Sequence, residues 1–189
     1  MTAEYKMKLA PQTLDNADAK AKPLLEKANA KLGFVPNMYQ AMAKAPGVLD
    51  TYLHGYELFR EESGFSPPEQ EVVFLTISRL NGCSYCMSAH SMLGEKVSQV
   101  PSEVIKALRN DQPIPDERLA ALSQFTQVIF DTRGKPNNAD VKAFLEAGFE
   151  EQHVMQIVLA MAVKTLSNYS NHINHPELDD AFADYAWEG

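Results

Sequence analysis

The stretch SPPEQEVVFLTISRLNGCSYCMSAH, residues 66–90, contains two predicted helices and the turn between them. Its opening, SPPE (66–69), is typical of a helix start, because a side-chain cap, proline in the first turn and an early acid all favour that end. We expect the helix to run to about Leu80, where Asn81-Gly82 supplies a residue that adopts the left-handed conformation. A second helix is then predicted from Cys83 to about Gly94.

The only two cysteines of the chain, Cys83 and Cys86, fall in the first turn of this second helix. His90 follows four residues after Cys86, so all three side chains share one helical face. A helix N-terminus favours an anion and makes a thiol there more acidic. A thiolate attacks a peroxide to give a sulfenic acid, and a second cysteine within reach closes a disulfide. His90 can move the protons that this reaction needs, and Glu71 on the preceding helix can fold back onto the site.

The rest of the chain is predicted to be helical. Apolar residues recur at 3–4 spacing over residues 119–130 and again over 154–166, whereas no segment alternates long enough to predict a strand. The sequence therefore predicts an all-α fold, with an extended or mobile segment over residues 1–15 and a single domain over 16–189. Residues 177–189 form a short terminal helix in this interpretation, with an aromatic anchor that docks in its own core or against another subunit.

Two segments of the chain are faintly alike. EQEVVFLTISRLNGCSYCMSAH (69–90) and EQHVMQIVLAMAVKTLSNYSNH (151–172) share their first two residues, a valine and the final histidine without a gap. Either an internal helical duplication or a chance match between two amphipathic helices accounts for this.

Composition narrows the class of protein. The 189 residues carry a formal net charge of -8, which argues against a nucleic-acid or anionic-membrane surface. No apolar run approaches the roughly 20 residues that span a bilayer. The first residues also lack the apolar stretch of a signal peptide. We therefore expect a cytoplasmic protein, and in that reducing compartment a lone CxxC is catalytic or metal-binding more often than structural.

The spacing Glu71-x11-Cys83-x2-Cys86-x3-His90 resembles the motif of the AhpD-like alkylhydroperoxidases, within the carboxymuconolactone decarboxylase superfamily. The flanking segments LGFVPNMYQAMAKAPGVLDTYL, FSPPEQEVVFLTISRLNGCSYCMSAHS and SNYSNHIN look like the branch labelled "peroxidase-related". The resemblance covers roughly residues 30–180. It implies an AhpD-like helical fold with the cysteine pair at a helix start.

The same resemblance implies an oxidoreductase, a thiol-dependent peroxidase or disulfide reductase. Cys86 is then the peroxidatic cysteine and Cys83 the resolving one, with Glu71 and His90 as the proton relay. The substrate is a hydroperoxide, no cofactor or metal is required, and electrons come from an external dithiol, either a protein or a small thiol. The family also implies a homo-oligomer, a trimer or a hexamer.

One position departs from the family pattern. The best-studied branch has a histidine just before the second cysteine, where this chain has Tyr85. A phenol with a pKa near 10 is a poor base at neutral pH. His172 or His175 is a candidate substitute for the missing imidazole.

Other functions fit parts of the same pattern. Two thiolates, His90 and Glu71 match the ligand types of a zinc site, although the chain has no second CxxC. A non-redox enzyme like carboxymuconolactone decarboxylase is a further alternative, although such members generally lack the cysteine pair. A non-enzymatic binding protein on the same helical scaffold would carry an unreactive CxxC.

Overall fold

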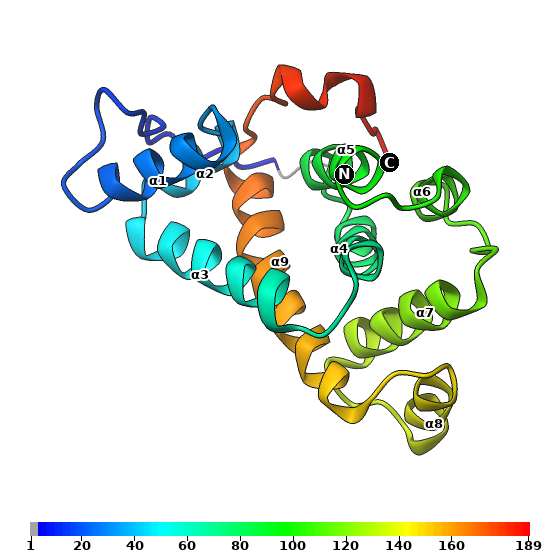
Figure 1. Cartoon of the computed structure of the whole chain (residues 1–189). Helices are drawn as coiled ribbons and strands as arrows, with labels where there is room; N and C mark the ends of the chain where they lie inside the picture. Colours follow the sequence, from blue (N-terminus) through cyan, green and yellow to red (C-terminus); the bar gives the residue numbers. More distant parts are fainter. Residues whose placement is uncertain (1–3) are drawn as a thin grey trace.

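Helix α4 (Pro67–Leu80) packs against five other helices, α3, α5, α6, α7 and α9 (Figure 1). The computed structural model describes residues 4–189, and these contain nine α-helices, one 3₁₀ helix and no strand. The prediction of an all-α fold is confirmed. The other elements, in chain order, are α1 (Lys22–Leu32), α2 (Asn37–Met42), α3 (Pro46–Glu62), α5 (Ser84–Lys96), α6 (Ser102–Arg109), α7 (Glu117–Thr132), α8 (Asn138–Glu146), α9 (Glu151–Asn174) and η1 (Asp180–Tyr185).

The ends of α4 follow from the residues at its termini. The backbone N–H and the hydroxyl of Ser66 both donate to one carboxylate oxygen of Glu69, each at 2.8 Å. These two bonds and the proline at the first helical position set the start. Gly82, with a φ of +65°, turns the chain out of the helix. The helix predicted from Ser66 to about Leu80 is therefore confirmed.

Helix α4 is buried on all sides. Each residue from Glu69 to Ser78 is buried, and α5, α6, α7 and α9 surround the helix. A helix that contacts neighbours on every face belongs to the interior of a domain. Glu71, which a surface helix would expose to water, is consequently placed in the core.

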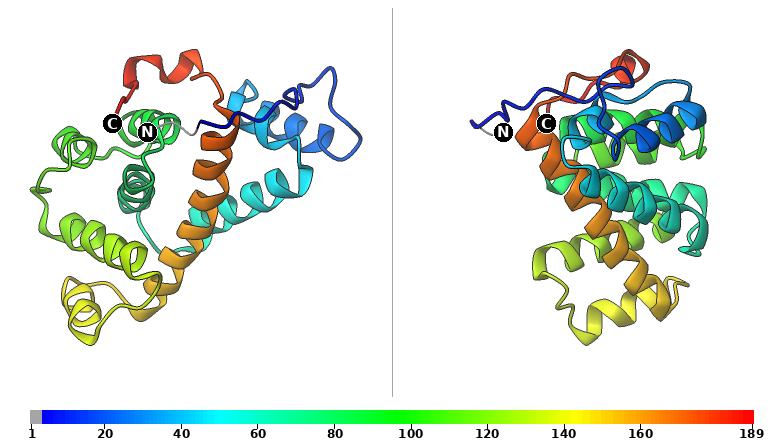
Figure 2. Two further views of the ribbon diagram at one scale, coloured as in Figure 1. Left: turned by 180° about the vertical axis from the view of Figure 1, so that it is seen from behind. Right: turned by 90° about the vertical axis from the view of Figure 1, so that its left-hand side faces the viewer.

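Two further helix pairings complete the arrangement. Helix α9 packs along α2 and α3 on one side of α4. Helices α7 and α8 form a hairpin at the end of the molecule opposite η1 (Figure 2). Among residues 4–189, no helix combines the length and the hydropathy that crossing a membrane requires.

The two segments that looked alike in sequence differ in structure. Residues 69–90 form nearly all of α4, a break at 81–83 and the first half of α5, whereas residues 151–172 lie within the single helix α9. The likeness between them is thus limited to helical structure and does not extend to the turn that carries Cys83.

The terminal segments pack against the body of the same chain. Residues 4–15 contain no helix, and the Met7 N–H donates to the Ile173 carbonyl at 2.9 Å. The first three residues of the segment predicted for 1–15 lie outside the described part of the chain. At the other end, η1 packs on α5 with Phe182 buried. The Trp187 indole donates to the Arg109 carbonyl at 3.0 Å. The predicted aromatic anchor therefore docks on its own chain.

Candidate active site

Both cysteines lie where α5 begins. Cys83 is the N-cap residue, and its carbonyl accepts the Met87 N–H at 3.0 Å, the first bond of the helix. Cys86 lies in the first turn. Both side chains are free thiols and are almost completely buried. The sequence prediction of a CxxC pair at a helix start agrees with this placement.

The two thiols differ in acidity. Burial alone would raise the pKa of the Cys86 thiol, but the hydrogen bond from Cys83 and the charges of Lys164 and His90 lower it well below its ordinary value. The same hydrogen bond, together with burial, raises the pKa of Cys83 well above its ordinary value. The first proton that the pair loses therefore comes from Cys86, and Cys83 keeps its proton.

An amide from α9 faces both sulfur atoms. The Nδ2 of Asn171 lies 3.5 Å from the sulfur of Cys83 and 3.3 Å from that of Cys86. An N–H donor at this distance stabilises a thiolate more than a thiol. In the sequence, Asn171 stood only within the flanking segment SNYSNHIN, and no local signal placed its side chain beside the cysteines.

Glu71 and His90 meet as the sequence predicted. The Nδ1 of His90 lies 2.8 Å from one carboxylate oxygen of Glu71, and Arg60 binds the other oxygen at 2.5 Å. Burial would raise the pKa of Glu71, but the positive charges of Arg60 and His90 lower it to about 2. Glu71 is therefore ionised at neutral pH, with Arg60 as its permanent partner. No pattern in the sequence pointed to Arg60.

The carboxylate of Glu71 fixes the tautomer of His90. Burial and the nearby charge of Lys164 lower the pKa of His90, although Glu71 opposes them, and this shift favours the neutral ring. An ionised carboxylate only accepts hydrogen bonds, so the proton is on Nδ1. The lone pair on Nε2 remains available to the site.

A buried lysine lies behind this group. Lys164 on α9 is 1% exposed, and its ammonium has no hydrogen-bond partner among residues 4–189. Its nearest aromatic contact is the face of the Phe74 ring, with Nζ 5.4 Å from the centroid. Burying a cation without a partner lowers the stability of the folded protein. The role of Lys164 is therefore electrostatic, since its charge lowers the pKa values of Cys86 and His90. Its position within an amphipathic helix gave no signal in the sequence.

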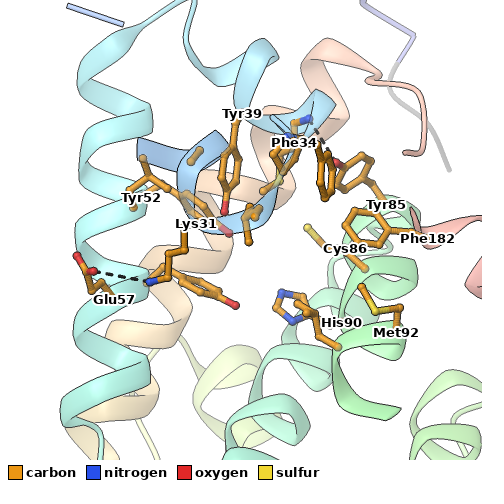
Figure 3. Close-up of a pocket in the computed structure, with 18 of the residues that line it drawn as sticks. Lys31, Phe34, Tyr39, Tyr52, Glu57, Tyr85, Cys86, His90, Met92 and Phe182 are labelled. Carbon is orange, nitrogen blue, oxygen red and sulfur yellow. Dashed lines mark hydrogen bonds and ion pairs between the residues drawn. The ribbon is translucent and has the colours of Figure 1, made fainter. Parts of the chain in front are cut away.

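Cys86 and His90 open into a cavity of about 300 Å³ that we call the aromatic cavity (Figure 3). Helices α1, α2, α3 and α5 and the C-terminal segment supply its lining. The ion pair of Lys31 and Glu57 also lies on this lining. The aromatic side chains that face the cavity are Phe34, Tyr39, Tyr52, Tyr56, Tyr85 and Phe182.

Tyr85 occupies the position where the resembled family has a histidine. Its hydroxyl bonds to the carboxylate of Asp179, and the Met38 N–H donates to it at 3.4 Å. Burial and the charge of Asp179 raise its pKa far above the ordinary value. Tyr85 therefore joins α5 to the C-terminal segment and does not act as a base.

The two candidate substitute histidines lie elsewhere. His172 and His175 line a different cavity, together with Cys83 and apart from Cys86 and His90. This position does not support the hypothesis that they replace an imidazole beside Cys86. Within the described residues, the Nε2 atoms of both rings are buried without a hydrogen-bond partner.

The contacts of the candidate ligands also test the hypothesis of a zinc site. In the part of the chain that the structure describes, no group of three or more His, Cys, Asp or Glu side chains is arranged to hold a metal ion. Both carboxylate oxygens of Glu71 are already bonded, one to Arg60 and one to His90. These contacts disfavour the metal site.

The fold and the cysteine pair define a class of all-helical proteins with an AhpD-like architecture. The model of the carboxymuconolactone decarboxylase family matches residues 46–127, which include the cysteines, Glu71 and His90. No curated protein matches the chain. Over residues 46–127, less than half of the chain, the sequence is similar to the carboxymuconolactone decarboxylase family.

Three solved structures have a similar fold. An uncharacterized peroxidase-related protein with an alkylhydroperoxidase AhpD core, from Ralstonia eutropha JMP134, is 22% identical, with 93% of each chain covered and a TM-score of 0.80. A peroxidase-related protein from Silicibacter sp. TM1040 is 20% identical, with 94% of this chain and 95% of that chain covered and a TM-score of 0.75. The debrominase Bmp8, as a cysteine-to-alanine variant with 2,3,4-tribromopyrrole, is 15% identical, with 95% and 96% covered and a TM-score of 0.75.

Proposed function

We propose that the protein is a thiol-dependent peroxidase that reduces organic hydroperoxides through Cys83 and Cys86. The observation that carries the proposal is that the more acidic thiol, Cys86, shares the aromatic cavity with the free Nε2 of His90. A nucleophile beside a base at the inner end of an apolar cavity is suited to a substrate with a hydrophobic body and one reactive group.

The reaction proceeds in two steps at these residues. Cys86 gives its proton to His90 and attacks the terminal oxygen of the hydroperoxide. The O–O bond breaks, Cys86 becomes a sulfenic acid, and the alkoxide takes the proton from His90 and leaves as an alcohol. Glu71 holds the imidazole in position and stabilises its transient positive charge.

The second step uses the protonated thiol. Cys83 attacks the sulfur of the sulfenic acid, a disulfide forms, and the hydroxyl group leaves as water with the proton of Cys83. An external dithiol then restores both thiols. Such a cycle suits a reducing compartment such as the cytoplasm. The homo-oligomer implied by the family remains part of this proposal.

Counting thiols tests the proposal. Fully reduced protein receives a small excess of cumene hydroperoxide, and free thiols are counted by mass spectrometry over time. We expect both thiols to disappear together into a Cys83–Cys86 disulfide. The matched variants separate the roles: Cys86→Ser should leave Cys83 unreacted, and Cys83→Ser should stop at the sulfenic acid of Cys86. Two thiols that survive the hydroperoxide would contradict the proposal.

The aromatic cavity also favours a second candidate function, reductive dehalogenation. Its aromatic lining and its volume of about 300 Å³ suit a single halogenated ring. The two thiols would supply two electrons, so that a carbon–bromine bond is replaced by a carbon–hydrogen bond, with release of bromide and formation of the disulfide. The thiol assay repeated with a brominated pyrrole, with bromide measured in parallel, distinguishes this reaction from peroxide reduction.

A further inference from the structure

Cys83 faces a second cavity that the aromatic cavity does not include. This C-terminal cavity has a volume of about 230 Å³ and is lined by Cys83, Ser84, Asn171, His172, His175 and Trp187, among others. Cys86 and His90 are absent from its lining, and Cys83 is absent from the lining of the aromatic cavity. Tyr85 belongs to both linings. Each cysteine of the pair thus lines a different cavity.

We propose that the C-terminal cavity admits a small aliphatic dithiol, which reduces the Cys83–Cys86 disulfide by attacking the sulfur of Cys83. The inference rests on the proposed function, in which the pair alternates between dithiol and disulfide. It assigns the oxidant and the reductant to separate cavities, so that neither has to leave before the other binds.

The dithiol reduces the Cys83–Cys86 disulfide in two steps, and in each step a thiolate attacks a sulfur atom. One thiolate of the reductant attacks the sulfur of Cys83, the Cys83–Cys86 bond breaks, and Cys86 leaves as a thiolate. The second thiolate of the reductant then attacks its own sulfur in the mixed disulfide and releases Cys83. The reductant loses two electrons and two protons and becomes a cyclic disulfide, and the protein gains both thiols.

Two features favour attack at Cys83. Within the described chain, Cys83 is the cysteine that lines the C-terminal cavity. Attack there also expels Cys86, the thiol with the lowered pKa, and thiol exchange is faster when the leaving thiol is more acidic. Asn171 donates toward the departing sulfur at 3.3 Å.

The lining of the C-terminal cavity suits a thiol. The buried Nε2 atoms of His172 and His175 have no partner within residues 4–189. Both imidazoles line the same cavity as Cys83 and add polar surface to it.

The size of the cavity favours a small reductant. At the roughly 30 Å³ that one water molecule occupies, about eight water-sized groups fill a cavity of this volume. A short dithiol such as dithiothreitol has that bulk. Because Trp187 covers one side, we expect the active-site loop of a folded protein reductant to be too large.

Oxidation and reduction of the cysteine pair are measured separately to test whether the reductant enters through the C-terminal cavity. The pair is oxidised with diamide, which is then removed, and recovery of thiols with dithiothreitol is followed by stopped-flow thiol titration. Ser84→Phe, at an exposed position on the lining, should slow this recovery by about tenfold or more and leave oxidation by cumene hydroperoxide unchanged. The matched control is Ala89→Leu in the aromatic cavity, which should slow oxidation and leave recovery unchanged.

A labelling experiment on the wild-type protein identifies which sulfur atom the reductant attacks. Diamide-oxidised protein is treated with 2-mercaptoethanol and quenched with N-ethylmaleimide, and the modified peptide is sequenced by mass spectrometry. We expect the mercaptoethanol group on Cys83 and the maleimide on Cys86. The reverse labelling would overturn the proposal, as would an equal effect of Ser84→Phe on both half-reactions.

Two further outcomes can be distinguished from failure of the proposed entry at Cys83. Faster recovery with thioredoxin than with dithiothreitol at equal thiol concentration would replace the small dithiol by a protein reductant and refute the size argument. If hydroperoxide fails to oxidise the pair, the proposed peroxidase function fails. The reduction assay on diamide-oxidised protein then still shows whether the reductant enters through the C-terminal cavity.

Discussion

Arg60→Met removes the positive charge that keeps Glu71 ionised in the core. A pKa of about 2 for Glu71, in place of 4.5, corresponds to about 3 kcal/mol of stabilisation of the carboxylate, at about 1.4 kcal/mol for each tenfold change. Removing one partner from a buried pair costs about 3–5 kcal/mol in other proteins. His90 remains as a second partner, so we expect the variant to lose about 3 kcal/mol of unfolding free energy at pH 7.

The loss should depend on pH in a defined direction. Glu71 has a lowered pKa in the folded protein, so its stabilising contribution is present above about pH 4.5 and disappears as the pH falls toward 2. In Arg60→Met this contribution is largely absent at every pH. The difference between the two proteins should therefore be greatest near neutral pH and shrink steadily below pH 4.5.

Urea unfolding followed by circular dichroism at several pH values measures this difference. Arg60→Met/Glu71→Gln should recover most of the loss, because it leaves no unpaired charge in the core. Lys27→Met, in the exposed pair with Glu57, is the matched control and should change stability little. A difference between wild type and Arg60→Met that stays constant from pH 7 to pH 3 would refute the reasoning.

Three further substitutions test other parts of the structure. Lys164→Met should raise the pKa of Cys86 and slow its alkylation by iodoacetamide at neutral pH several-fold. The same variant should be at least as stable in urea, since it removes an unpaired buried cation; faster alkylation would contradict the assignment. Tyr85→Phe removes the bond to Asp179, so limited proteolysis of the C-terminal segment should accelerate; an unchanged digestion pattern would show that the bond does not hold this segment. Ser66→Ala weakens the cap of α4 and should lower the unfolding free energy by about 1 kcal/mol without moving the cysteines, which urea titration beside the thiol assay measures.

Local sequence signals predicted the part of the site that lies on α4 and α5. The cap at Ser66 and the glycine at position 82 set where α4 begins and ends. The spacing of the cysteines and His90 follows from helical geometry alone. Glu71 faces His90 because two consecutive helices joined by a short turn pack against one another. These relations depend on residues fewer than 25 positions apart.

The remaining features of the site depend on distant contacts. Arg60 arrives from α3, and Lys164 and Asn171 arrive from α9, which packs against both α4 and α5. The sequence of α9 predicts a helix with a buried face, but it does not say which neighbour that face contacts. The bond between Tyr85 and Asp179 joins residues 94 positions apart, and the sequence does not predict it either.

The central position of α4 also determines how the site responds to thermal fluctuation. The backbone amides of a helix enclosed by four others exchange their hydrogens with solvent only when the whole domain unfolds. The amide of Glu71 should therefore be among the slowest to exchange, whereas amides in residues 4–21 and in η1 should exchange through local opening. The carboxylate that orients His90 is thus in the most persistent element of the fold, and the segment over the C-terminal cavity is in one of the least persistent. On this basis, warming the protein would loosen access to Cys83 well before it disturbs the Glu71–His90 pair.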